Sequence, residues 1–152
     1  MPTIRHAHRL RIGRYSAPGQ IYLVTTIVQN RNPVFKDFMQ GRLVVDALRK
    51  AQEEDLVLSL AWVVMPDHLH WLFELKNNTL TCIMARTKSR IALALNRSIG
   101  RDGALWQHGF HDRAIRRDED LPAVARYVVA NPLRAGLVEK IGDYPLWDAV
   151  WL

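Results

Sequence analysis

His68 and His70 are the two residues whose types and spacing most directly suggest chemistry. Successive side chains of a strand point to opposite faces, so two histidines separated by one residue share a face. Leu69, Trp71 and Phe73 fall on the other face, where they would hold the strand against a core. Two imidazoles fixed in this way can bind one metal ion, since histidine is the commonest protein metal ligand. The alternative is a half-exposed strand whose outer face carries histidines with no ligand.

A second candidate pair, Tyr127 and Asn131, lies four residues apart near the C-terminus. In a continuous helix this spacing points both side chains the same way. Tyr127 brings a phenol, and Asn131 brings an amide oxygen that could be a third metal ligand. A tyrosine in an amphipathic helix more often packs than reacts, and Asn131-Pro132 could be a plain helix stop.

Other polar residues could support or extend such a site. His111 or Asp112 could orient a ligand or replace the third ligand, and Glu74 falls on the same strand face as the histidines. The alternative is that they are ordinary polar groups of a strand. The expected helix 80–99 carries a stripe of three arginines, Arg86, Arg90 and Arg97, which is either a solvated face or a nucleic-acid backbone contact.

The composition fits one globular domain. The chain has 152 residues, of which 49% are hydrophobic and 24% charged, which argues against disorder. The single Cys82 rules out an internal disulfide, is expected to be a small buried hydrophobe, and suits a reducing cytosol. No apolar run approaches the roughly 18 residues of a membrane span. We therefore expect a cytoplasmic protein with no membrane partner.

The net charge of +6 is concentrated at the N-terminus. Residues 1–36 contain six basic side chains and no acidic ones. Four of the six lie in the first 14 residues: Arg5, Arg9, Arg11 and Arg14. This pattern predicts a basic arm over residues 1–19, which would neutralise nucleic-acid phosphates, followed by a single domain over residues 20–152. The alternative is a solubilising tail.

Strand and helix periodicities alternate along the chain. Strands are expected over residues 20–29, 57–65, 68–75 and 106–117, and helices over 40–54 and 80–99. Acidic residues at 118–120 begin a final helix that should end near Asn131, before Pro132. The order β-α-β-β-α-β predicts an α+β fold with a ferredoxin-like antiparallel sheet. The additional C-terminal helix would cover the sheet face that carries His68 and His70.

Three segments together resemble a known family. His68-Leu69-His70 matches the His-hydrophobic-His motif of the HUH single-tyrosine nucleases. The segments VMPDHLHWLFEL, LWQHGFHDRAIR and YVVANPLRAGLV resemble the REP-associated tyrosine transposases. These are bacterial relatives of the small insertion-sequence transposases, which act on single-stranded DNA. The resemblance extends over most of the chain, as far as Trp147.

The resemblance implies a role for each candidate residue. His68, His70 and Asn131 would hold a divalent metal, Mg²⁺ or Mn²⁺. Tyr127 would attack a phosphodiester and form a 5′-phosphotyrosine with release of a 3′-OH, and no ATP would be needed. The partner would be single-stranded or hairpin DNA, including REP-like palindromes, bound by a monomer or homodimer in the nucleoid of a bacterial cytoplasm.

Two other functions remain open from the sequence. A domesticated relative would bind hairpin DNA without mobilising it. A non-enzymatic RNA-binding module with a ferredoxin-like sheet would carry exposed aromatic side chains on its open face.

Overall fold

A five-stranded antiparallel sheet forms the centre of the computed structural model, which describes residues 16–151. The strands are β1 (Ile21–Ile27), β2 (Val57–Met65), β3 (His68–Leu75), β4 (His111–Ala114) and β5 (Trp147–Ala149). The α-helices are α2 (Phe38–Glu53), α3 (Leu80–Ile99), α4 (Leu121–Val129) and α5 (Asn131–Arg134). The sheet order is β4-β1-β3-β2-β5. The elements up to β4 follow the predicted β-α-β-β-α-β order, so the ferredoxin-like α+β fold is confirmed.

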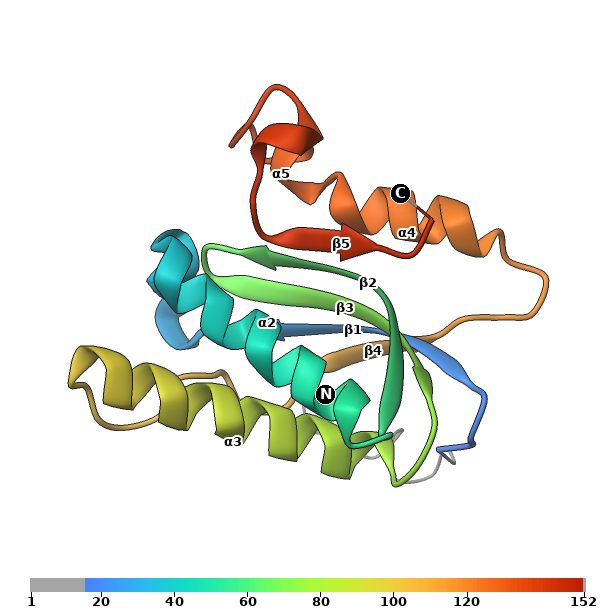
Figure 1. Cartoon of the computed structure of the whole chain (residues 1–152), viewed down its shortest axis with the longest axis horizontal. Coiled ribbons are helices and arrows are strands. Elements are labelled where there is room, and N and C mark those ends of the chain that lie inside the picture. The colour runs from blue at the N-terminus through green and yellow to red at the C-terminus, as the bar shows by residue number, and fades with distance from the viewer. Residues whose placement is uncertain (1–15, 152) are drawn as a thin grey trace, which may run out of the picture.

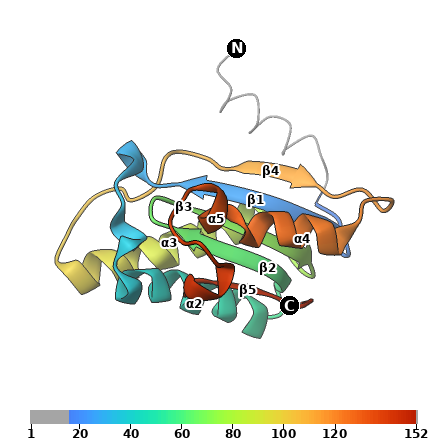
Figure 2. The same ribbon diagram turned by 90° about the horizontal axis from the view of Figure 1, so that it is seen from above.

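The two faces of the sheet are covered by different helices (Figures 1 and 2). Helices α2 and α3 pack on the face that carries Leu69, Trp71 and Phe73, all fully buried in the main core. Helix α4 lies on the opposite face, as the sequence predicted. A non-enzymatic RNA-binding module would carry exposed aromatic side chains on an open sheet face. In this protein a helix covers that face.

Helix α4 is held on the sheet by its own apolar stripe. Ala125 and Val129 pack with Leu72 of β3, and Val128 packs with Val63 and Met65 of β2. These α4 residues are three and four positions apart, the spacing that brings side chains to one helix face. Because Leu72 and Val63 alternate with residues of the main core along their strands, the sheet separates two apolar layers.

The helices begin where capping residues predict. Asp37 accepts hydrogen bonds from two backbone N–H groups at the start of α2, and Thr79 and Asp120 each accept one at the starts of α3 and α4. Gly100 ends α3 in the left-handed conformation, with φ at 65°. None of the helices within residues 16–151 combines the length and apolar character of a membrane span.

Several local expectations were wrong. The strand expected over 106–117 is shortened to β4, because Gly109 at φ 77° turns the chain and leaves Trp106 with only an isolated bridge to Val28. Cys82 is exposed on α3 rather than buried. The short strand β5 had no counterpart in the sequence analysis.

Pro132 was expected to stop the C-terminal helix, but it lies within a second, short helix. Helix α4 ends at Val129, Ala130 lies between the two helices, and Asn131 begins α5. Pro132 sits in the first turn of α5, where the missing N–H is tolerated because it would have no partner within the helix.

Candidate active site

His68 and His70 lie on the face of β3 that α4 covers. Both side chains are partly buried, and their ring centroids are 4.8 Å apart with the ring planes at 88°. In the antiparallel register His70 lies between Thr25 of β1 and Val63 of β2. The histidines are thus adjacent to Val63 and Met65, which Val128 of α4 contacts.

The Nδ1 atom of His70 is engaged across the sheet. It lies 2.8 Å from Oγ1 of Thr25. Burial, followed by the charge interactions with His68 and Arg134, lowers the pKa of His70 to about 4. The imidazole is therefore neutral at pH 7. The tautomer that donates from Nδ1 to Thr25 leaves the lone pair on Nε2.

The Nδ1 atom of His68 is engaged by its sequence neighbour. It donates to Oδ1 of Asp67 at 2.6 Å, and the other carboxylate oxygen accepts from Nε of Arg31 at 2.9 Å. Burial acts to raise the pKa of Asp67, but the hydrogen bonds from His68 and Arg31 outweigh it, and the pKa is lowered. Because a charged carboxylate only accepts, His68 carries a proton on Nδ1, and Nε2 is the ring atom left to bind a metal.

This pattern of hydrogen bonds suits metal ligation. A metal-bound histidine typically donates its other ring N–H to an oxygen, which fixes its tautomer and orientation. Neither Thr25 nor Asp67 was identified from the sequence as a partner of the histidines. Asp67 directly precedes His68 in the chain, but its residue type alone does not mark it as a partner of the imidazole. Thr25 could not be paired with His70 without the strand register.

The side-chain amide of Asn131 makes one hydrogen bond among the described residues. Its Nδ2 donates to the carbonyl oxygen of Val128 at 2.8 Å, so the amide oxygen is left for another partner. Within residues 16–151, no three His, Cys, Asp or Glu side chains are grouped so that they could hold a metal. A third protein ligand beside the histidines would therefore be of another type, and an amide oxygen is a suitable one. Two imidazoles and an amide would fit Mn²⁺, and Mg²⁺ less readily, because Mg²⁺ prefers oxygen ligands.

The other polar residues considered from the sequence lie apart from the histidine pair. Asp112 pairs in register with Val24 and so faces the α2 and α3 layer. His111 is on the histidine face, but β1 separates it from His70, and two strand spacings amount to about 10 Å. Glu74 is also on that face, with the fully buried Leu72 between it and His70. The part proposed for them in binding a metal is therefore not supported.

Tyr127 is the exposed tyrosine of the described chain. Its side chain is 65% exposed on α4, whereas Tyr22 is 2% exposed in the core between the sheet and the α2 and α3 layer. The hydroxyl of Tyr144 donates to the carbonyl oxygen of Val64 at 2.6 Å, and burial raises the pKa of Tyr144 to about 12. Of these three tyrosines, only Tyr127 could present its oxygen to a substrate. Tyr15 lies outside the described residues.

Tyr127 and Asn131 do not share one continuous helix, which their spacing had predicted. Helix α4 ends at Val129, before Asn131. The segment after α4 is nevertheless close to the tyrosine, because the Cζ atom of Arg134 in α5 lies 3.8 Å from the centroid of the Tyr127 ring. Arg134 was not singled out from the sequence.

A model of the family described as "Transposase IS200 like" matches residues 17–131. The chain belongs to the IS200-like transposase family. The matched segment contains both histidines and Tyr127, and it ends at Asn131.

Two curated relatives support the resemblance to the REP-associated tyrosine transposases. The protein of that name from Escherichia coli K12 is 25% identical over 134 residues, which cover 87% of this chain and 78% of that protein. A Haemophilus influenzae protein given the same name is 27% identical over 139 residues, which cover 84% and 78% of the two chains.

Solved structures share the fold. The REP-associated tyrosine transposase bound to a REP hairpin superposes with a TM-score of 0.73 at 24% identity, over 88% of this chain and 79% of that one. A Deinococcus radiodurans protein described as a transposase gives a TM-score of 0.56 at 18% identity, over 76% and 93%. At these identities the likeness establishes the fold.

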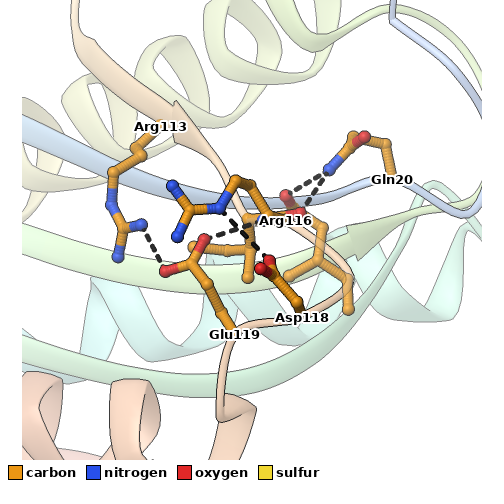
Figure 3. A network of polar contacts seen from close by, with 7 residues as sticks. Gln20, Arg113, Arg116, Asp118 and Glu119 are labelled. Carbon is orange, nitrogen blue, oxygen red and sulfur yellow. Dashed lines mark hydrogen bonds and ion pairs between the residues drawn. The ribbon is translucent and has the colours of Figure 1, made fainter.

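In this IS200-like transposase, polar contacts fix the segment that leads into α4 (Figure 3). Glu119 accepts hydrogen bonds at 2.7 Å from both the guanidinium of Arg113 and the backbone N–H of Arg116. These bonds lower the pKa of Glu119, so it stays charged. Gln20 donates to the carbonyl oxygens of Ile21 and Ile115, which ties the same segment to the start of β1. The helix that carries Tyr127 therefore leaves the sheet in a fixed direction.

The arginine stripe expected to contact DNA lies on the other side of the molecule. Helix α3 covers the sheet face opposite the histidines (Figure 1). Arg90 forms two hydrogen bonds of 3.2 Å to the carboxylate of Glu54, and Arg86 adds to the charge that lowers the pKa of Glu54. Arg97 is exposed near the end of α3. The four arginines of the predicted N-terminal arm lie outside the described residues.

Proposed function

We propose that this protein cleaves single-stranded DNA at or near hairpins and rejoins it, with Tyr127 as the nucleophile. The observation that carries the proposal is the pair of histidines with both Nδ1 atoms engaged and both Nε2 atoms free. They lie on the sheet face covered by the helix that carries the one exposed tyrosine of the described chain. Membership of the IS200-like transposase family supports the same function.

His68, His70 and the amide oxygen of Asn131 would hold the divalent metal, Mn²⁺ or Mg²⁺. When bound, such an ion offsets negative charge on a non-bridging oxygen of the phosphate under attack. Asp67 keeps His68 with its proton on Nδ1, and Thr25 holds the ring of His70 in place. The low pKa of His70 keeps that ring neutral, so it does not repel the ion.

The reaction exchanges one phosphoester bond for another. The oxygen of Tyr127 attacks phosphorus and loses its proton to solvent, while the bond from phosphorus to the 3′ oxygen breaks and that oxygen gains a proton. The products are a 5′-phosphotyrosine and a free 3′-OH. Since a phosphoester is conserved, the same or another 3′-OH can reverse the step and join DNA strands without ATP.

The partner that we propose is hairpin DNA of the REP type, in a bacterial cytoplasm. A protein of the same fold has been solved bound to a REP hairpin, and the net charge of +6 of this chain suits a polyanion. Cleavage distinguishes this proposal from a domesticated relative that only binds hairpins.

The decisive experiment follows a covalent adduct. End-labelled hairpin DNA with single-stranded flanks is incubated with Mn²⁺ or Mg²⁺ and run on a denaturing gel, and the modified peptide is located by mass spectrometry. Wild-type protein should give an adduct that carries DNA on Tyr127. Tyr127→Phe should give none, yet bind the hairpin as tightly, because only an exposed hydroxyl is removed.

Tyr144→Phe is the matched control. It removes a hydrogen bond to Val64 and should cost about 1 kcal/mol of stability while leaving the adduct intact. An adduct in Tyr127→Phe would assign the nucleophile to another residue. The absence of an adduct in the wild type, with tight hairpin binding, would mean a binding protein that no longer cleaves.

A further inference from the structure

Arg134 is a cation that lies beside the proposed nucleophile and has no counter-charge among residues 16–151. Its guanidinium carbon lies 3.8 Å from the centre of the Tyr127 ring, and its side chain is exposed. It makes no ion pair with any carboxylate of residues 16–151, whereas Arg31, Arg90, Arg113 and Arg116 each do.

The position over the Tyr127 ring leaves the hydrogen-bonding groups of Arg134 free, since none of them bonds to another residue of the described chain. A guanidinium is planar and has five N–H groups in that plane. When the plane stacks on an aromatic ring, the N–H groups point outward rather than into the ring. The ring thus fixes the position of the guanidinium while its donors remain available to a ligand.

The charge of Arg134 also acts on the histidine pair. Its charge is one of the causes that lower the pKa of His70, after burial and the charge of His68. In α5, Arg134 follows Asn131 by three residues, the spacing that places two side chains on neighbouring positions of a helix surface. One short helix therefore carries both an amide oxygen and a cation that make no hydrogen bond or ion pair within residues 16–151.

We propose that Arg134 binds the phosphate that Tyr127 attacks, using its free N–H groups while its guanidinium is held on the face of the tyrosine ring. This inference rests on the proposed cleavage function and adds a substrate-binding residue to it. Phosphate is the suitable ligand because its oxygens match the planar fork of a guanidinium. As negative charge builds up on those oxygens during attack, the interaction strengthens in the transition state.

A purely structural role is the competing explanation. The stacking could serve only to hold α5 against α4. In that case Arg134 would affect stability, but neither the rate of cleavage at saturating DNA nor the response to the charge of one phosphate.

The first measurement compares Arg134→Ala, Arg134→Lys and Arg126→Ala. Arg126 precedes Tyr127 on α4, is exposed, and makes no ion pair in the described chain, so its removal changes the net charge equally. Single-turnover adduct formation is measured with Mn²⁺ at saturating hairpin. Arg134→Ala should slow it about 100-fold, the typical effect of losing one donor to a developing oxyanion. Arg134→Lys should recover part of the rate, and Arg126→Ala should retain it.

The second measurement tests contact with the phosphate itself. The length of the DNA in the adduct identifies the scissile phosphate, which is then replaced by an uncharged methylphosphonate. Affinities are measured in a Tyr127→Phe background, where no cleavage occurs. The uncharged linkage should weaken binding about tenfold when Arg134 is present, which corresponds to one charge-assisted hydrogen bond, and should have little effect after Arg134→Ala. Arg126→Ala should leave the tenfold effect unchanged.

The outcomes separate this inference from the proposed function. Two results would refute the inference about Arg134 but not the cleavage function. One is that the wild type forms the adduct and Arg134→Ala forms it at the same rate. The other is that the methylphosphonate weakens binding equally with and without Arg134. No adduct from the wild type refutes the cleavage function and the inference with it. Thermal unfolding of each variant shows whether a lost rate merely reflects a lost fold.

Discussion

Thr25 provides a direct test of how the histidine pair is organised. Its hydroxyl lies 2.8 Å from Nδ1 of His70, on the neighbouring strand and in register with it. Thr25→Val replaces the hydroxyl by a methyl group of similar size, so the strand and its packing are kept. The substitution removes the hydrogen bond that orients the ring of His70.

The expected losses follow from the position of this bond. Partners of a metal-binding histidine are typically worth 10- to 100-fold in metal affinity or activity, so Mn²⁺ binding should weaken by at least about tenfold. The half-buried Nδ1 of His70 is left without its partner, so stability should fall by about 1 kcal/mol. The rate of adduct formation at low Mn²⁺ should fall in parallel, and high Mn²⁺ should restore it.

Thr26 is the matched control because it is the next residue of β1 and faces the other side of the sheet. It is 1% exposed, and its hydroxyl has no hydrogen-bond partner among the described residues. A buried hydroxyl without a partner costs free energy, so Thr26→Val should be neutral or stabilising by up to about 1 kcal/mol. It should leave Mn²⁺ affinity unchanged.

Calorimetric titration with Mn²⁺ and urea unfolding measure both quantities on the same samples. Unchanged Mn²⁺ affinity in Thr25→Val would refute the claim that this hydroxyl prepares His70 as a ligand. Equal losses of stability in the two variants would show that the effect comes from valine in β1 and not from the hydrogen bond.

Two further predictions concern pH. The pKa of His70 lies at about 4, against 6.5 for an unperturbed histidine, so the unfolded chain takes up this proton first as the pH falls. The free energy of unfolding should therefore fall between pH 6.5 and pH 4, by about 3 kcal/mol at most. Urea unfolding of His70→Gln should show a flatter dependence on pH over that range. The pKa of Glu119 is lowered by its bonds to Arg113 and Arg116. Its contribution to stability is therefore fully present above pH 4.5, the ordinary pKa of a glutamate, and is lost as the pH falls through the lowered pKa. Glu119→Gln should unfold at a lower urea concentration than the wild type at pH 7, and the difference should vanish in acid. An unchanged acid response in either variant would contradict its assignment.

The sequence predicted best the elements whose apolar pattern agrees with the turn or capping residues at their ends. Strand β2 and helix α3 were predicted with the bounds that the structure has. A continuous apolar run ended by Pro66 defines β2, while Thr79 and Gly100 cap α3. Strand β5 was missed because three residues are too few to show an alternating pattern, and it forms only by pairing with the edge of β2.

Only the part of the candidate site that follows from a local sequence pattern was predicted. The shared face of His68 and His70 follows from the period of a strand, which is local. Their partners depend on structure that the local pattern does not contain. Thr25 reaches His70 through the register of two strands, and Arg134 reaches Tyr127 only because the chain breaks at Ala130 and begins a second helix.

The described chain begins at the end of the sheet where β3 leads into α3. The backbone N–H of Gly19 bonds to Leu75 at the end of β3, and the hydroxyl of Ser16 accepts from Leu80 at the start of α3. Leu75 is five residues along the strand from His70, or about 17 Å at the rise of a strand. Residues 16 and 19 are therefore attached at the end of the sheet that is remote from His70.

Deleting residues 1–14 should therefore weaken binding and leave the chemistry intact. Loss of four phosphate contacts from Arg5, Arg9, Arg11 and Arg14 predicts a change of roughly 3 in the slope of log affinity against log salt for single strands. The rate of adduct formation at saturating DNA should not change, because no residue proposed for the reaction lies in the deleted segment. An unchanged salt slope would show that residues 1–14 do not contact phosphates, and a lost rate at saturation would place part of the active site within them.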